Sequence, residues 1–170
     1  SVLSADEWSE NDFDVPPIPQ EIREEFRRRG SQLWDWMNNP ADVSIMVPGE
    51  PYSVPAALIE MSKHPNFDFI AANVSEDFPF GEEHFIKAMT DDIEGYIEVS
   101  KQSAKPFLVI FGTRPLSANE MDHWRWRTIA QMRNRLIEEH IPFFSTVDQA
   151  ARAVSKLVDY YQRREGRDRQ

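Results

Sequence analysis

The second half of the chain alternates between two hydrophobic periods. Short, nearly continuous apolar runs at 67–74 and 107–112 are typical of strands covered on both faces. Between them, residues 83–101 carry apolar side chains at helical spacing. The alternation then repeats with a helical pattern within 119–140, a third strand at 142–145, and a last helix that begins with a capping box of Thr146 and Gln149.

Strands that are separated by single helices predict parallel pairing, and therefore a doubly wound, mainly parallel α/β sheet. Residues 1–161 form one domain on this reading, and the polar segment 162–170 is expected to be a frayed tail. The signal is weaker upstream, where we expect helices at 2–8, 20–29 and 52–63 and a strand at 43–47.

The chain opens on a helix, whereas an open α/β sheet usually begins with a buried strand and a glycine-rich turn. The six glycines are scattered at 30, 49, 81, 95, 112 and 166, and none forms a phosphate loop. We therefore expect a sheet that lacks its first strand and its glycine-rich loop: either the domain starts unconventionally, or residues before Ser1 are missing.

Composition narrows the class of protein. The sequence has no cysteine, and it has no apolar stretch of the roughly 20 residues that span a bilayer, so we expect a soluble cytoplasmic protein without membrane contact. Residues 101–170 are basic, but the arginines of the 119–140 helix ring its axis as solvated surface and form no stripe for nucleic acid. These arginines are Arg125, Arg127, Arg133 and Arg135.

Catalytic chemistry has no clear carrier in this sequence. The histidines at 64, 84, 123 and 140 are expected at surfaces or helix ends, and no pair has zinc-binding spacing. Acidic pairs such as Asp91-Asp92 lie on solvated helix faces. We read the tryptophan pairs 34/36 and 124/126 as packing groups rather than base-stacking groups. We therefore predict no catalytic residue and no metal site.

Several short blocks nevertheless occur together and in a fixed order. The chain resembles the carboxy-terminal flavodoxin-like module of NDP-forming acyl-CoA synthetases, a relative of the last domain of the succinyl-CoA ligase β subunit. The likeness spans about 1–161, and it departs from the family at His140, where the family has glycine, and in the absent glycine loop. The matching blocks are 1–8 (SVLSADEW), 13–17 (FDVPP), 39–42 (NPAD), 105–106 (KP), 140–144 (HIPFF) and 150–154 (AARAV).

The resemblance implies an acid-thiol ligase that joins a carboxylic acid to CoA through an acyl phosphate and a phosphohistidine. It implies that this chain binds no cofactor itself, while the parent enzyme uses ATP or GTP with Mg and CoA. The implied partners are the CoA-binding, phosphohistidine and ATP-grasp modules, and a homo-oligomer is compatible with it. The isolated chain is expected to be inactive, as a part that shapes the phosphohistidine and acyl site.

The family places a helix start at the phosphohistidine, which corresponds here to Ser1 and Val2. A helix start favours phosphate through free N–H groups and the helix dipole, although an ordinary surface helix fits equally. Asn39 and Asp42 either orient the acyl substrate or form a local turn. The loop Ser75 to Gly81 follows the carboxyl end of a strand, where open sheets bind ligands, yet its aromatic residues equally fit a contact with another module.

A regulatory or scaffold module with a receiver-like α/β fold is the alternative. Lys105-Pro106-Phe107 is a tripeptide seen in receivers, but this lysine precedes a strand, whereas the receiver lysine ends one. No aspartate ends the 67–74 strand, as phosphoacceptor chemistry would require.

Overall fold

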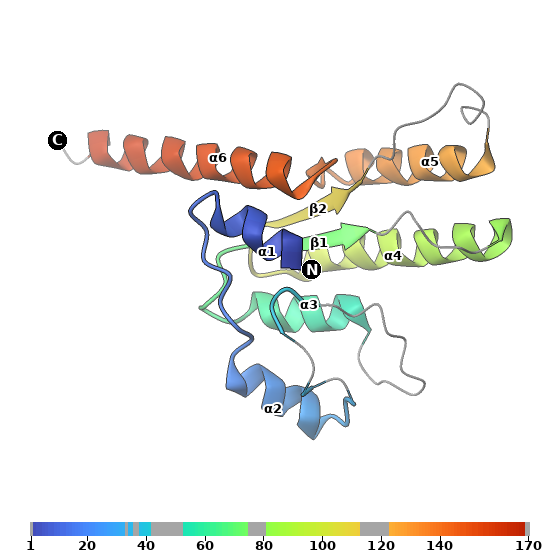
Figure 1. Cartoon of the computed structure of the whole chain (residues 1–170), viewed down its shortest axis with the longest axis horizontal. Helices are drawn as coiled ribbons and strands as arrows, with labels where there is room; N and C mark the ends of the chain where they lie inside the picture. The colour runs from blue at the N-terminus through green and yellow to red at the C-terminus, as the bar shows by residue number, and fades with distance from the viewer. Residues whose placement is uncertain are drawn as a thin grey trace.

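A computed structural model describes residues 2–32, 34–35, 38–41, 53–74, 81–112 and 123–168. These residues form three strands and six helices in an α/β arrangement (Figure 1). The elements are α1 (Val2–Ser9), α2 (Gln20–Arg28), α3 (Val54–Ser62), β1 (Ile70–Val74), α4 (Glu82–Gln102), β2 (Phe107–Phe111), α5 (Trp124–Glu138), β3 (Phe143–Phe144) and α6 (Val147–Asp168).

The three strands form one open parallel sheet in the order β1-β2-β3. Val74 is level with Phe111, and Phe144 is level with Ile110, so the three strands end at one edge of the sheet. Helices α4 and α5 provide the two crossovers. The prediction of a parallel α/β sheet is confirmed at this level.

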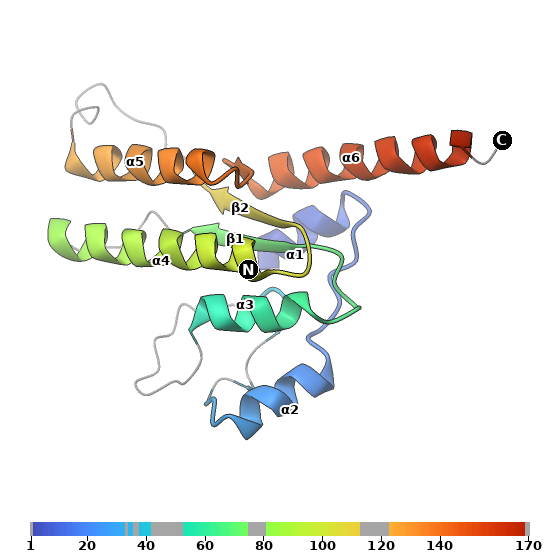
Figure 2. The same cartoon turned by 180° about the vertical axis from the view of Figure 1, so that it is seen from behind.

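Helices cover both faces of the sheet, which explains why the β2 sequence FLVIF is apolar throughout. Phe107, Val109 and Phe111 face a large core that includes α4 and α5, while Leu108 and Ile110 face a smaller core with α1 and α6. Helix α1 lies in front of the sheet in Figure 1 and behind it in Figure 2. Helix α3 lies beside α4, and α2 lies beyond α3 (Figures 1 and 2).

The predicted elements are present wherever the structure describes the residues, with shifted boundaries. The strand expected within 67–74 begins at Ile70, and the helix expected within 52–63 begins after the N-cap Ser53, whose side chain accepts a hydrogen bond from the Ala56 N–H. The strand expected at 43–47 lies outside the described residues. At the other end, α6 stays helical to Asp168, through most of the segment expected as a frayed tail.

The sheet reaches an edge at β1 within the described part of the chain. Ile70 N–H donates to the Pro106 carbonyl beside β2, at 2.9 Å. Because backbone groups alternate along a parallel strand, the N–H and C=O groups of Ala71 and Asn73 face away from β2. No described strand pairs with that side of β1.

Candidate functional site

The carboxyl edge of the sheet is the place to look for a ligand, because loops that follow parallel strands converge there. Residues 75–80 and 113–122, which follow β1 and β2, lie outside the described residues. The described surroundings of the edge are Gly112, the turn after β3 and the side chains that reach this edge from α4 and α5. The start of α1 lies over the face of the sheet, short of the strand tips (Figures 1 and 2).

Helix α1 points its amino end in the direction in which the strands run (Figure 1). It packs against α6, and Trp8 anchors it through ring contacts with Phe13 at 5.4 Å and Phe69 at 5.1 Å. The first turn of α1, which begins at Val2, contains no acidic residue. The positive end of the helix dipole is therefore turned toward the carboxyl side without a competing carboxylate. Ser1 lies outside the described residues.

Asn39 binds backbone in the connector that leads from α1 to α2. Its Nδ2 donates to the Pro16 carbonyl at 2.9 Å. Arg23 holds the same region, donating from Nε to the Ile18 carbonyl at 3.3 Å and from Nη2 to Asn38 Oδ1 at 2.6 Å. Asn39 thus has a structural role here, and its partner in the predicted substrate loop, Asp42, lies outside the described residues.

Gly81 is the N-cap of α4, and it stands away from the sheet edge. Helix α4 has 21 residues, roughly 31 Å at 1.5 Å per residue, and β1 has five, roughly 17 Å. The last turn of α4 lies near the start of β2, and the helix is longer than the strands. Its first turn therefore projects beyond the strand tips and beyond the start of α1 (Figure 1). Glu82 and Glu83 occupy that turn and oppose an anion there. Ser75 lies outside the described residues.

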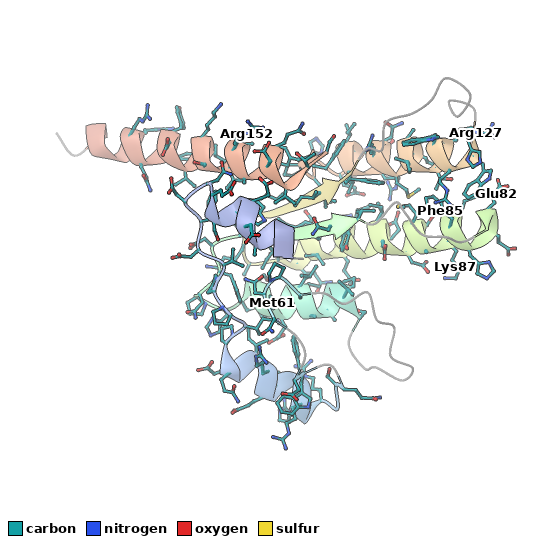
Figure 3. All side chains as sticks on the ribbon, viewed as in Figure 1. Met61, Glu82, Phe85, Lys87, Arg127 and Arg152 are labelled. Atoms are coloured by element: carbon teal, nitrogen blue, oxygen red, sulfur yellow. The ribbon has the colours of Figure 1, made fainter. Side chains whose placement is uncertain are left out.

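The projecting end of α4 is paired with the start of α5. Phe85 is fully buried and meets Trp124 edge to face at 5.4 Å, while the Arg125 guanidinium lies 4.4 Å from the centre of the Phe85 ring. Glu82 and Arg127 lie at the same end (Figure 3). Trp124 is therefore a packing residue, as predicted, and so is Trp34, which lies beneath Arg27 at 4.9 Å.

Arg133 is a site residue that the sequence analysis missed. It was assigned to solvated helix surface, but it is half-buried at the carboxyl end of β2. Its Nη2 donates to the carbonyls of Phe111 at 3.1 Å and Gly112 at 2.7 Å, and its guanidinium lies 5.0 Å from the Phe111 ring centre. This arginine places a positive charge at the sheet edge. Its position beside Met132, on the buried side of α5, was the available signal.

Tyr96 and Asp92 form a second feature that the sequence did not reveal. Tyr96 Oη donates to the Asn73 carbonyl at 3.0 Å, on the side of β1 that faces away from β2. Burial, and then the charge of Asp92, raise the pKa of the Tyr96 hydroxyl. Burial, and then the charge of Asp91, raise the pKa of Asp92. Asp92 is therefore a partly buried carboxyl group, whereas we had predicted a fully solvated face.

The four histidines lie at the surface or at helix ends, as predicted. His123 caps α5, its Nδ1 accepting from the Arg125 N–H, and the His64 Nδ1 accepts from the Asn66 N–H. His84 is exposed in the first turn of α4, and His140 follows α5. Within the described residues, no group of three His, Cys, Asp or Glu side chains is arranged to hold a metal ion. The same residues include no helix both long enough and apolar enough to cross a membrane.

Comparison with known proteins adds no assignment. No protein family, no curated protein and no solved structure matches this chain.

Proposed function

We propose that this chain is a module of an NDP-forming acyl-CoA synthetase and contributes to the site where a phosphohistidine and an acyl group meet. The observation that carries the proposal is the placement of α1. This helix, which carries the first block of the resemblance, packs on the sheet with its amino end turned toward the carboxyl side and with no acid in its first turn. A phosphoryl group supplied by a companion module would be stabilised there by free amides and the helix dipole.

The layering supports a flavodoxin-like module. Helices α1 and α6, the first and last, share one face of the sheet, and the crossover helices α4 and α5 share the other. A flavodoxin-like domain has this distribution when the chain passes from one face to the other at the central strand. The three strands correspond to the last three of such a sheet.

Two details of the resemblance also fit. The VPP and NPAD blocks, distant in sequence, touch through the hydrogen bond from Asn39 to Pro16. His140, which replaces a family glycine, has φ of 58°, a left-handed conformation that glycine adopts most readily. The family preference for glycine is therefore explained by the backbone at this position.

The proposed role is to shape the site rather than to carry the covalent step. None of the four histidines has the surroundings of a phosphorylated residue, and the nucleotide, Mg and CoA belong to the other modules of the enzyme. The Arg133 charge at the β2 end is a second feature that would favour an anionic acyl phosphate nearby.

The alternative of a receiver-like regulatory module draws no support from the strands. Lys105 lies before β2 and not at its carboxyl end, and the described strands end in Val74, Phe111 and Phe144 rather than in an aspartate. Receiver chemistry needs both residues at the carboxyl edge.

The proposal is tested by complementation. The chain, the companion CoA-binding, phosphohistidine and ATP-grasp modules, and the two together are incubated with ATP or GTP, Mg, CoA and a panel of short, branched and aromatic acids. Acyl-CoA is expected only in the combined mixture. Absence of acyl-CoA for every acid, or aspartate labelling of the chain by acetyl phosphate, would count against the proposal.

A matched pair of variants tests the role of α1. Val2→Glu adds a carboxylate to the first turn of α1, where it favours the helix but opposes a phosphoryl group. Gln20→Glu makes the same change in the first turn of α2, away from the sheet. We expect Val2→Glu to slow acyl-CoA formation by about tenfold or more, roughly 1.4 kcal/mol in the barrier, and Gln20→Glu to leave it unchanged. Equal rates in the two variants would remove α1 from the site.

A further inference from the structure

The outer edge of β1 offers backbone groups for pairing. The N–H and C=O groups of Ala71 and the N–H of Asn73 face away from β2, and no described strand pairs with them. The Asn73 carbonyl accepts from the Tyr96 hydroxyl on this side, and a carbonyl has a second acceptor position. Ala71 is half-buried and Asn73 is exposed, so solvent reaches this edge.

The sequence of β1 does not protect this edge. Edge strands of soluble proteins commonly carry a charged residue or a proline, which hinders pairing with another chain. The β1 sequence IAANV has neither. An unprotected edge of this kind is a template for an additional strand.

The helix layer on the α4 face of the sheet continues past this edge. Helix α4 packs against both β1 and β2, with α5 on one side of it and α3 on the other. Packed helices lie about 8–10 Å apart and paired strands only about 4.8 Å apart, so α3 lies under the position of a strand added to β1. The apolar side chains of α3 that are only partly buried are Val54, Leu58 and Ile59. An added strand therefore gains apolar contacts as well as backbone hydrogen bonds.

Carboxylates gather at the amino end of β1. Phe13 packs against Phe69, just before β1, with ring centres 5.5 Å apart. This contact brings the exposed neighbours of Phe13, Asp12 and Asp14, to the amino end of the strand, where Asp68 is also exposed. None of these three carboxylates has an ion-pair partner in the part of the chain that the structure describes.

The basic residues of this half of the chain do not neutralise these carboxylates. Lys63 pairs with Glu60, and Lys87 pairs with Asp91. All four arginines within residues 1–100 belong to α2 or its C-cap, and α2 lies beyond α3 (Figure 1). The charge around the β1 edge therefore favours a positively charged partner.

The same charges disfavour a second copy of the chain. Antiparallel pairing of two β1 edges would bring the Asp68 end of each strand beside the carboxyl end of the other. Asp92, one helical turn before Tyr96, lies near that carboxyl end and is partly buried. Acidic groups would then face acidic groups across the new pair of strands.

We propose that the outer edge of β1 is a docking edge for an extended segment of a partner protein, with lysine or arginine where the segment passes Asp12, Asp14 and Asp68. The segment adds a strand to the sheet through the backbone groups of Ala71 and Asn73, and its apolar side chains cover α3. This proposal goes beyond the proposed ligase function and does not depend on it.

Three capped peptides test the proposal on the full, isotope-labelled chain. Lys-Val-Thr-Val-Thr-Val-Lys has a basic residue at each end and so fits either strand direction. We expect it to bind with a dissociation constant of roughly 0.1–1 mM, with amide shifts and slowed hydrogen exchange centred on Ala71 and Asn73. Lys-Val-Thr-Pro-Thr-Val-Lys keeps the charge but interrupts the strand, and Glu-Val-Thr-Val-Thr-Val-Glu reverses the charge. Both should bind about tenfold more weakly or less.

Variants of the chain test the same contacts from the other side. Ala71→Pro removes an outward-facing N–H without removing a bond to β2, so it should abolish binding and leave the fold intact. Asp14→Lys should weaken binding of the lysine peptide and strengthen binding of the glutamate peptide, each about twofold to fivefold. Glu24→Lys makes the same charge change at an exposed position on α2, and it should alter neither affinity. Circular dichroism verifies that each variant is folded.

Four results would overturn the proposal. The first is that the lysine peptide does not bind, and the second is that all three peptides bind equally. The third is that the amides of Ala71 and Asn73 are already protected from exchange in the free chain, which would mean that the chain covers its own edge. The fourth is a dimer of the free chain in light scattering that Ala71→Pro abolishes, which would make a second copy the occupant.

Discussion

Gly30 and His140 occupy the same position in two copies of one helix-ending turn. Both have left-handed backbones, with φ of 85° at Gly30 and 58° at His140. Each turn has the crossed pair of backbone hydrogen bonds of a Schellman motif. The pairs are Gly30 N–H to Arg27 C=O and Ser31 N–H to Phe26 C=O, both at 2.9 Å, and His140 N–H to Ile137 C=O at 3.0 Å with Ile141 N–H to Leu136 C=O at 2.9 Å.

The two positions should respond to substitution in opposite directions. A left-handed backbone costs a residue with a side chain roughly 1–2 kcal/mol, and glycine avoids this cost. Glycine also gives the unfolded chain more conformational freedom, which offsets part of the gain in stability. We expect His140→Gly to raise the free energy of unfolding by about 0.5–1 kcal/mol. Gly30→His should lower it by about 1 kcal/mol. Urea unfolding measures both, and a loss of stability in His140→Gly would contradict the strain argument.

Gly95 of α4 lies directly against Pro55 at the start of α3. A Cβ at Gly95 would stand 2.5 Å from the Pro55 Cγ, which belongs to a stiff ring. Gly95→Ala gains helix propensity of about 1 kcal/mol, but the clash forces the two helices apart and costs roughly 1–3 kcal/mol. We expect a net loss of stability.

A double-mutant cycle with Pro55→Ala isolates this contact. Removal of the ring should make Gly95→Ala neutral or stabilising, because only the helix propensity then remains. The measurement is urea unfolding of the four proteins. If Gly95→Ala costs the same with and without Pro55, the clash is not its cause.

Local sequence patterns were sufficient to predict the elements because burial follows periodicity. The β2 run is apolar at every position since both faces are covered, and α4 carries Phe85, Met89 and Ile93 on its one buried face. The Thr146 cap was also readable, and its side chain accepts the Gln149 N–H at 3.2 Å. These features need only neighbours in sequence.

The site residues were harder to predict because long-range contacts define them. The neighbour Met132 indicates that Arg133 lies near the buried side of α5, but only the fold shows that its guanidinium binds the carbonyls at the end of β2. Nothing near Tyr96 shows that its hydroxyl reaches Asn73 across 23 positions. The length of α6 was also missed, because a polar sequence such as QRREGRD lacks an apolar face yet contains good helix formers.

Asp92 makes stability depend on pH in the acidic range. Its pKa is raised above the ordinary value, so the folded state holds the proton more tightly than the unfolded state. The resulting stabilisation is present at low pH and is lost as pH rises through the raised pKa. We expect Asp92→Asn to raise the melting temperature at pH 7 and to have little effect near pH 3.

Asp91→Asn serves as the control for this carboxyl. Asp91 is exposed and pairs with Lys87 at the surface, so its loss should change stability by less than about 0.5 kcal/mol at either pH. If Asp92→Asn behaves like Asp91→Asn at pH 7, Asp92 is solvated in solution.

Tyr96 should make the stability of the protein fall at alkaline pH. The effect of Tyr96→Phe on stability should therefore change sign as pH rises. At pH 7, Tyr96→Phe loses the hydrogen bond to the Asn73 carbonyl and about 0.5–1.5 kcal/mol of stability. The raised pKa of Tyr96 means that its contribution is complete below the pKa of an unfolded tyrosine, near 10, and is lost at higher pH. The phenylalanine variant has no such loss, so the two stability curves should converge above about pH 10 and then cross. Tyr161→Phe, at an exposed position, should follow the unmodified protein throughout, and parallel curves for Tyr96→Phe would show that the hydroxyl ionises without restraint from the fold.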